Sequence, residues 1–267
     1  MANSLSVYVE GLSLWSPRLP SWEIARSVIR GEREIPQDPV SRPQTSLLPP
    51  TERRRIPDTV AVALEVAVRA CEASTRDRAL LPAVFASTHG DTPISDYMCS
   101  TLASTPALIS PTKFHNSVHN AAAGYWSIGV RSFAPYTSIS AYQYTFAAGL
   151  LEAAMQAVCE RTAVLFVAFD IEATGPLAPM SQCCHLLGIG MVIAPDSLAR
   201  ESRKLQLAID SGGAGQSFTR ARSSAAQLLE GNALTPAFAL LEALASADPS
   251  EVSLALGTDT ALKVQVQ

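Results

Sequence analysis

Charge and export signals are scarce in this chain of 267 residues. Only 16% of the residues are charged, and the net charge of −4 gives no basic footprint of the kind that general nucleic-acid binding needs. The longest apolar runs are interrupted well before the roughly 18 residues of a membrane span. The first residues, MANSLSVYVEGLSLW, lack the basic region and the unbroken apolar run of a signal peptide. We therefore expect a cytoplasmic protein with no membrane span and no nucleic-acid partner.

The sequence also has few cysteines and no clear motif for binding a metal ion. Five cysteines, an odd number in a chain without an export signal, predict reduced thiols. His115 and His119 stand four residues apart, but Asn116 follows the first where a zincin helix has glutamate. The run CCH at 183–185 is too compact for a tetrahedral site by itself. The sequence predicts no metal site and no cofactor.

Apolar residues make up 48% of the chain and follow strand-like and helix-like patterns in turn. Asp58 is predicted to cap a long helix. The sequence predicts strands over residues 6–15, 81–87, 136–140, 162–170, 186–194, 204–210 and 251–257. It predicts helices over residues 22–30, 59–74, 94–102, 115–128, 145–159 and 233–245.

This alternation indicates an α/β protein, and strands that are apolar on both faces indicate a mainly parallel sheet covered on both sides. The order of elements begins again near Lys204. The second pass is expected to stop after one strand, one helix and one strand.

The stretch SISAYQYTFAAG, residues 138–149, reads as a buried strand, a sharp corner and the start of a helix of small residues. Helix N-termini carry unpaired N–H groups and the positive end of a dipole, and a cysteine placed there reacts as the thiolate. This corner holds Tyr142, Gln143 and Tyr144 instead. Because a glutamine amide attacks nothing, the chain has the platform of a nucleophile without the nucleophile.

Several motifs around this corner occur in one order and at family spacing. SISAYQ resembles the strand and T-A-C turn of the β-ketoacyl synthases of the thiolase fold, with Gln143 where the acyl-accepting cysteine stands. SPTKFHNSVHNAAAGYWSIG, residues 110–129, resembles the synthase segment that leads into N-x-x-A-G-x-x-S-I. VFASTHGD, residues 84–91, resembles V-x-x-S-G-x-G-G, and LFVAFDIEA, residues 165–173, resembles V-x-x-G-G-x-E.

The resemblance covers about residues 58–210. It implies a thiolase-like layered α/β/α fold. The chain would have a complete N-terminal half over residues 1–200 and a truncated remnant of the C-terminal half over residues 201–267.

Further catalytic groups of the synthases, two histidines and a lysine, come from the second half of that family. SLALGTDT, residues 253–260, resembles their turn N-A-H-G-T-G-T and places Leu256 at the first histidine position. The chain ends at Gln267, so the second histidine and the lysine have no positions here.

The pattern resembles the chain length factors, the silent partners of ketosynthases, and most of all their short aryl polyene type. This implies a heterodimer with an active β-ketoacyl synthase, whose acyl tunnel the chain would shape during polyene or polyketide (fatty-acid-like) elongation on an acyl carrier protein.

Two other functions remain open. The first is a malonyl-acyl carrier protein decarboxylase that generates primers through Gln143, as glutamine-bearing ketosynthases of loading modules do. That chemistry needs histidines to stabilise the developing enolate, and the expected positions lack them. The second is a homodimeric acyl-binding protein without a synthase partner.

The resemblance also implies which residues line the tunnel and the dimer interface. Phe114 is the most natural stopper of an acyl chain, because an aromatic ring acts sterically. The strand YTSIS, residues 136–140, would pair across a two-fold axis with its equivalent in the partner, which removes an open edge. The buried interface would exceed ~2,000 Å² in total. Plain core packing is the alternative for each of the candidates, which are His89, Thr92, Lys113, Phe114, His115, Tyr142 and Tyr144.

The run Arg53, Arg54, Arg55 is basic on an otherwise acidic chain. Acyl carrier proteins are acidic and carry a phosphopantetheine phosphate, and arginine suits both. We expect these arginines to contact the carrier protein. The alternative is a solvated turn before a helix, with Glu52 and Asp58 partly neutralising the charge.

Overall fold

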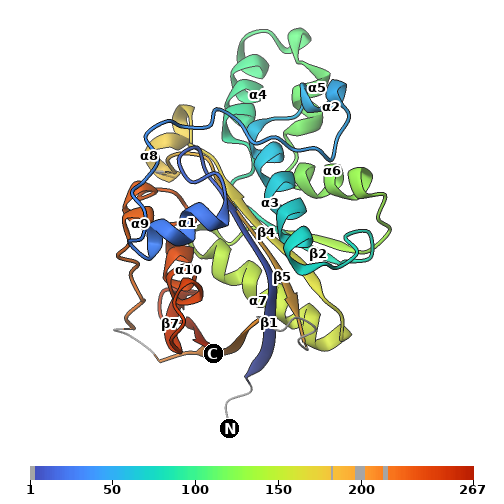
Figure 1. Ribbon diagram of the computed structural model, residues 1–267. Helices are drawn as coiled ribbons and strands as arrows, with labels where there is room; N and C mark the ends of the chain where they lie inside the picture. The colour runs from blue at the N-terminus through green and yellow to red at the C-terminus, as the bar shows by residue number, and fades with distance from the viewer. Residues whose placement is uncertain (1–3, 182, 196–201, 213–215) are drawn as a thin grey trace.

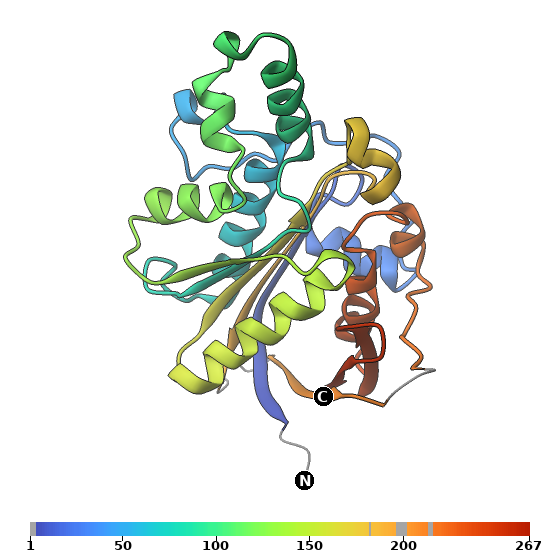
Figure 2. The same ribbon diagram turned by 180° about the vertical axis from the view of Figure 1, so that it is seen from behind.

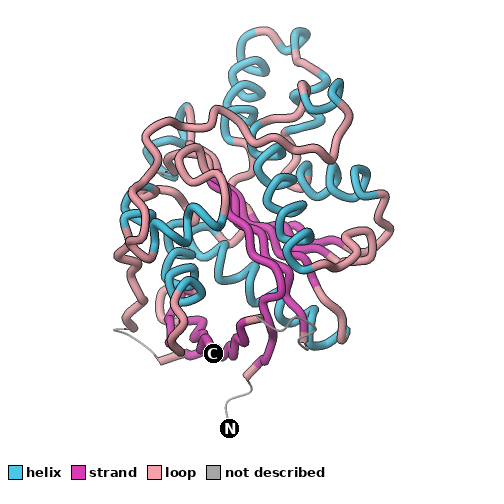
Figure 3. Tube along the Cα trace, viewed as in Figure 1, coloured by secondary structure: helices cyan, strands magenta, loops and turns pink. Residues whose placement is uncertain are grey.

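The computed structural model describes residues 4–181, 183–195, 202–212 and 216–267, which form one sheet with helices on both faces (Figures 1 and 3). The strands are β1 (Leu5–Trp15), β2 (Ala83–Ala86), β3 (Tyr136–Ile139), β4 (Val164–Asp170), β5 (Leu187–Ala194), β6 (Arg203–Asp210), β7 (Ser250–Ala255) and β8 (Ala261–Val266). The helices are α1 (Trp22–Ile29), α2 (Pro50–Arg53), α3 (Asp58–Ser74), α4 (Thr92–Ser104), α5 (Pro111–Asn116), α6 (Ala121–Val130), α7 (Thr145–Glu160), α8 (Ala178–Ser181), α9 (Ser224–Leu228) and α10 (Phe238–Ala245).

The described strands lie in the order β3-β2-β4-β5-β1-β6-β8-β7. Pairing is parallel between β2 and its two neighbours, β3 and β4. The remaining neighbours pair antiparallel, so the predicted mainly parallel sheet is wrong. The apolar runs of β4 and β5 reflect burial on both faces, and burial carries no information about strand direction.

Two apolar cores lie on opposite faces of the sheet. On one face α3 and α6 cover β2 and β4, with Trp126 buried between them. On the other face α7 and α10 enclose Phe166 and Phe238, and Figure 2 shows α7 running across the sheet. Truncating any of these aromatic side chains to alanine should cost about 3–5 kcal/mol of stability.

Close packing explains why α7 is built from small residues. At Gly149 a Cβ atom would lie 2.7 Å from a ring carbon of Phe166 and 2.8 Å from the Cβ of Ala86. Contacts this short admit no side chain, so the helix approaches β4 and β2 only where glycine and alanine face them. This approach fixes the position of the N-terminus of α7, where the corner lies.

Three predictions differ from the observed elements, and one observed strand was not predicted. The helix expected over residues 115–128 is two helices, α5 and α6, because the chain turns between them. The α-helix expected from residue 233 begins at Phe238, after a 3₁₀ turn over Thr235–Ala237. Asp58 is the first helical residue of α3, and Pro57 occupies the cap position without a side-chain bond. β8 is an additional strand, which a short turn separates from β7.

The segment from Ser202 onward continues the same sheet, because β6 pairs antiparallel with β1. The strands β6, β8 and β7 repeat the antiparallel arrangement of β1, β5 and β4. In the part of the chain that the structure describes, no counterparts of β2 and β3 follow. The predicted boundary at residue 200 lies outside the described residues. No helix in the described ranges is long and apolar enough to cross a membrane.

Candidate functional site

The carboxyl ends of the parallel strands β2, β3 and β4 meet at one edge of the sheet. Ligands of α/β proteins bind preferentially at such edges. The segments that leave these ends are Ser87–Gly90 after β2, Ser140–Tyr144 after β3 and Ile171–Ala173 after β4. The predicted corner is one of the three.

A short 3₁₀ turn, Tyr142–Tyr144, connects β3 to α7 at this corner. Tyr142 has a positive φ of 51°, which costs a residue with a side chain of order 1–3 kcal/mol. The hydroxyl of Thr145 holds the turn, because its Oγ1 accepts a hydrogen bond from Ala141 N at 3.0 Å and donates one to Tyr142 O at 2.6 Å. The corner is therefore a sharp and fixed strand-to-helix turn, which is the geometry that elsewhere presents a nucleophile.

No nucleophile occupies the turn. Gln143 is exposed, and its Nε2 donates to the hydroxyl of Tyr144 at 2.7 Å. Burial raises the pKa of the Cys71 and Cys183 thiols to about 12, so both stay protonated at neutral pH. Among the described residues, no group of three or more His, Cys, Asp and Glu side chains gathers to hold a metal ion.

Asp170, at the end of β4, holds the neighbouring loop in place. Its carboxylate accepts hydrogen bonds from Ser87 Oγ at 2.9 Å, from Thr88 N at 2.9 Å and from Thr88 Oγ1 at 3.0 Å. Burial raises the pKa of Asp170 to about 7, although these hydrogen bonds act in the opposite direction. Sequence reasoning missed this role, because the aspartate stands at the end of an apolar run with no polar neighbour to mark a site.

Further hydrogen bonds join the loop after β2, Ser87–Gly90, to the corner and to His119, which lies between α5 and α6. Ser140 Oγ donates to Thr88 O at 2.8 Å, and an imidazole nitrogen of His119 lies 2.8 Å from Ser87 O. The ring of His89 lies 6.1 Å from that of Tyr142, so the structure brings these two predicted residues together. Burial, and next the proximity of His119, lower the pKa of His89, which favours the neutral imidazole.

The other predicted tunnel residues lie on the projecting α4–α5 lobe at the top of Figures 1 and 2. Thr92 is buried at the start of α4, where its hydroxyl donates to Glu172 O at 2.9 Å, so it does not face open space. The Lys113 ammonium lies 3.6 Å from the centre of the Tyr97 ring. Phe114 is 61% exposed, and its ring is free to pack against another molecule.

Exposed apolar side chains surround β3, which is an edge strand of the sheet. Ile128 on α6 is 73% exposed, and Phe133 in the following loop is fully exposed. Soluble monomers rarely leave such residues side by side near an unpaired strand edge. The exposed large apolar residues on α6, β3, the corner and the α4–α5 lobe are Leu102, Leu108, Phe114, Val118, Ile128, Phe133, Tyr136 and Tyr142.

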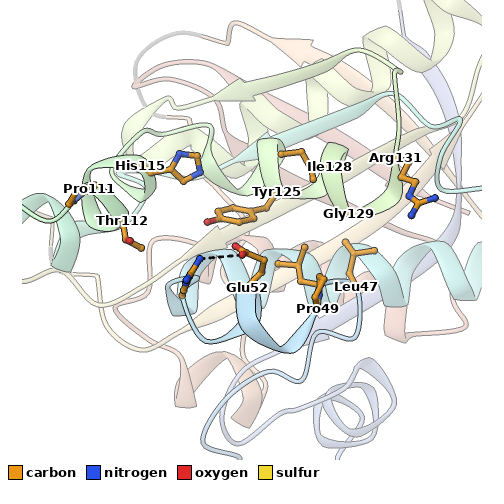
Figure 4. Close-up of a pocket in the computed structure, with 12 residues that line it drawn as sticks. Leu47, Pro49, Glu52, Pro111, Thr112, His115, Tyr125, Ile128, Gly129 and Arg131 are labelled. Atoms are coloured by element: carbon orange, nitrogen blue, oxygen red, sulfur yellow. Dashed lines mark hydrogen bonds and ion pairs between the residues drawn. The ribbon is translucent and has the colours of Figure 1, made fainter.

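His115 lines a groove of about 660 Å³ between α5, α6 and the segment before α2 (Figure 4). Its ring meets that of Tyr125 edge to face at 5.7 Å between centres. Figure 4 shows Leu47 and Pro49 on the opposite wall. Ile128 also lines the groove, so the groove opens toward the apolar surface around β3.

The three predicted arginines do not act as one group. Arg55 pairs with Glu52, with 3.5 Å between Nη1 and Oε1, and lines the groove of His115. Arg53 and Arg54 line a different cleft, on the other side of α2. Leu256 lies far along the chain in the β7–β8 turn, where its N–H donates to Thr260 O at 3.0 Å. Its equivalence to a histidine stays a prediction.

Comparisons with known proteins show the family of this chain. The sequence matches the model of the β-ketoacyl synthase N-terminal domain over residues 29–253. A comparison with curated proteins finds no match.

Several solved structures share the fold. One is a ketosynthase in complex with its chain length factor from Xenorhabdus doucetiae, with a TM-score of 0.71 and 20% identity over 98% of this chain and 99% of the matched chain. The ishigamide ketosynthase/chain length factor matches with a TM-score of 0.67 and 15% identity, over 98% and 99% of the two chains. A type II polyketide synthase acyl carrier protein in complex with its ketosynthase, bound to the hexaketide, matches with a TM-score of 0.74 and 11% identity over 100% and 99%.

Proposed function

Because the chain belongs to the β-ketoacyl synthase N-terminal domain family, we propose that it is a catalytically silent chain length factor that pairs with an active ketosynthase. One observation carries the proposal. The strand-to-helix corner keeps the strained geometry of a nucleophile turn at Tyr142, yet the turn contains Gln143 and no nucleophile. A platform kept without its reactive group serves a structural purpose.

That purpose is to hold β3 at the edge of the sheet as a seam for a partner strand. An open edge exposes a row of N–H and C=O groups, which a second strand can satisfy. The apolar side chains of Ile128, Phe133 and Tyr136 beside this edge would become buried in the same contact. Burial of apolar area gives about 25 cal/mol per Å², which supplies the driving force of association.

The α4–α5 lobe and the corner would then meet the acyl tunnel of the partner. Phe114 and Tyr142 are exposed and apolar, and His89 lies beside Tyr142 with a lowered pKa. Neutral and apolar groups suit contact with a growing acyl chain. We propose that Phe114 limits the length of the chain, in elongation of the polyene or polyketide type in the cytoplasm, most like the aryl polyene pathways.

The carrier protein is the second proposed partner. Arg53 and Arg54 carry positive charge without an ion pair among the described residues, so they remain available to an acidic surface. Steering by such charges raises association rates more than it raises affinity.

A decarboxylase that acts through Gln143 is the second candidate function, because the side-chain amide of Gln143 is exposed to solvent. A homodimeric acyl-binding protein would use the same open edge and apolar surface for a second copy of the chain.

Reconstitution separates these functions. Carbon dioxide release from malonyl-acyl carrier protein would be measured with this chain alone, with the ketosynthase alone and with both. A silent partner releases none alone and is required for elongation by the synthase. Release by this chain alone would replace the proposal with the decarboxylase, and a synthase that elongates equally well without the chain would refute it.

A further inference from the structure

A cleft of about 390 Å³ lies between the segment 41–45, α2 and the start of α3. No acidic residue is among the residues that line it within the described ranges. The chain as a whole has a net charge of −4, so a local excess of positive charge requires an explanation. The polar residues of the lining are Ser41, Arg42, Gln44, Thr45, Arg53 and Arg54.

Arg42 is held in a fixed orientation at this cleft. Its Nε forms an ion pair with the carboxylate of Asp58 at 2.9 Å without hydrogen-bond alignment, and its Nη2 donates to Ile56 O at 2.6 Å. No described residue pairs with its Nη1 nitrogen. A guanidinium fixed in this way loses little further conformational freedom when it binds a ligand.

Arg53 and Arg54 add the rest of the charge. Neither side chain has an ion pair in the described part of the chain, whereas their neighbour Arg55 pairs with Glu52 and faces another groove. Asp58 neutralises one of the three cleft arginines. The cleft therefore keeps an excess of positive charge.

Two further features favour an anion. Thr45 is only 1% exposed, and its Oγ1 and the Nε of Arg53 are buried without a hydrogen-bond partner among the residues described. Buried polar atoms in folded proteins nearly always have partners. The first turn of the 17-residue helix α3 contributes Ala61 to the lining, so the positive end of its dipole lies at the cleft.

We propose that this cleft binds the phosphate group of a small organic phosphate ester. Arginine binds phosphate oxygens through two parallel N–H groups, and fixed arginines give such sites their selectivity. The cleft is larger than a phosphate ion and falls in the size range of small-molecule sites. The ester comes either from a free metabolite or from the phosphopantetheine arm of a carrier protein. The proposal rests on the carrier-protein contact proposed above for Arg53 and Arg54 and names the group that these residues would bind.

Calorimetric titration with inorganic phosphate and with 4′-phosphopantetheine tests this site, on the chain as purified, with its partner if it needs one. We expect phosphopantetheine to bind and the double variant Arg53→Gln/Arg54→Gln to weaken that binding at least about tenfold. Arg55→Gln is the control for the single variants Arg53→Gln and Arg54→Gln, because each of the three removes one positive charge from the same run and only Arg55 faces elsewhere. Binding should change by less than about twofold in this control.

Two results would overturn the proposal: no binding of either probe, or a loss in Arg55→Gln equal to the loss in the single variants Arg53→Gln and Arg54→Gln. An equal loss would mean that the run attracts anions only through its net charge. If the probes bind as expected, apo and holo carrier protein distinguish the two sources. If the chain binds holo carrier protein more tightly than the apo form, and the double variant abolishes this difference, the phosphate ester is the phosphopantetheine arm. If the two forms bind equally, the ester is a free metabolite. Binding is compared between variants in the same preparation, so a synthase that elongates without this chain would refute the proposed function and leave the result at the cleft unchanged.

Discussion

The two edge strands of the sheet, β3 and β7, differ in how their outer edges are protected: the edge of β7 is covered, and the edge of β3 is open. The edge of β7 is covered by a loop, in which Thr219 N donates to Ser253 O at 2.8 Å and Thr219 Oγ1 accepts from Ser253 N at 2.9 Å. The exposed side chains nearby are polar, and Gln265 Nε2 donates to Glu251 Oε2 at 3.2 Å. This edge resembles those of soluble monomers, which are blocked by loops and charges.

At β3 neither protection is present in the described part of the chain. Beyond β3 no further strand follows in the sheet, and Ile128, Phe133 and Tyr136 expose apolar side chains beside it. Both edge strands belong to the same chain and face the same solvent. The amino-acid composition of the chain as a whole therefore does not explain why one edge is covered and the other is open. The contrast indicates that the β3 edge is prepared for another strand and that the β7 edge is closed.

Blocking the outward N–H groups of β3 should have the largest effect on assembly. Pro135 O accepts a hydrogen bond from Ala83 N on β2 at 3.1 Å, and Ile139 O accepts one from Ser87 N, just after β2, at 3.2 Å. Alternation along a parallel ladder therefore directs the N–H of Ser138 outward. Ser138→Pro should weaken binding to the ketosynthase at least about 100-fold, as measured by biosensor binding. Ser138→Val keeps the N–H and should bind nearly normally. Equal binding by the proline variant would show that β3 is not the seam.

An acidic side chain on the apolar surface should have the next largest effect. Burial of an isoleucine contributes about 1.5–3 kcal/mol, so Ile128→Asp should weaken association about 10- to 100-fold. Ile209→Asp is the matched control, since Ile209 is also exposed, at 54%, but lies on β6. We expect this control to leave association unchanged. Similar losses in both variants would remove the distinction between the two regions.

The pH dependence of stability should report the Asp170 loop beside β3. Because the pKa of Asp170 is raised to about 7 in the folded chain, the folded state holds a proton that the unfolded state has lost above its ordinary pKa near 4. Stability contributed by this group therefore falls as pH rises from about 4 to 7, by about 2 kcal/mol between pH 5 and 7.5. Asp170→Asn should flatten that slope in thermal unfolding. An unchanged slope would contradict the assignment.

Removing the ring of Phe114 should change the product rather than the assembly. If the ring closes the tunnel, Phe114→Ala leaves more room for the acyl chain, and mass spectrometry should detect longer products. Leu80→Ala is the control, because Leu80 is 73% exposed but lies outside the α4–α5 lobe. A product of unchanged length would exclude Phe114 as the stopper.

The smallest effect is expected at the corner itself. Gln143 is exposed, and its one side-chain hydrogen bond goes to the neighbouring Tyr144. Substitutions of exposed side chains change stability by about 0.5 kcal/mol or less. Gln143→Ala should therefore change the elongation rate of the reconstituted synthase by less than about twofold. A loss of activity together with a loss of carbon dioxide release would favour the decarboxylase.

Much of the fold could be predicted from local patterns. The apolar runs located β1, β4, β5 and β6, and the small residues after Gln143 located α7, because such elements depend on neighbours in the sequence. Strand direction and order depend on which distant segments meet, so the antiparallel pairs and the continuation of β1 into β6 were not predictable from periodicity.

The site divides in the same way. The corner was predictable, because a strand, a turn and a helix follow each other in the chain. The resemblance to the family named His89 and Tyr142 separately, and only the structure shows that their rings lie 6.1 Å apart. The hydrogen bonds of Asp170 to the loop after β2 join residues about 80 positions apart, and no local signal marks them. The division of Arg53 and Arg54 from Arg55 depends on the turn of α2, which reverses the direction of side chains within one run.

The seam at β3 is tested most directly by the mass of the assembly. The chain would be co-expressed, with the only tag on it, with the ketosynthase encoded nearest to it, and the purified species measured by light scattering. We predict a one-to-one heterodimer, which Ser138→Pro converts to the free chain or to insoluble material while Ser138→Val remains paired. A stable homodimer that excludes the synthase would contradict the proposed partnership.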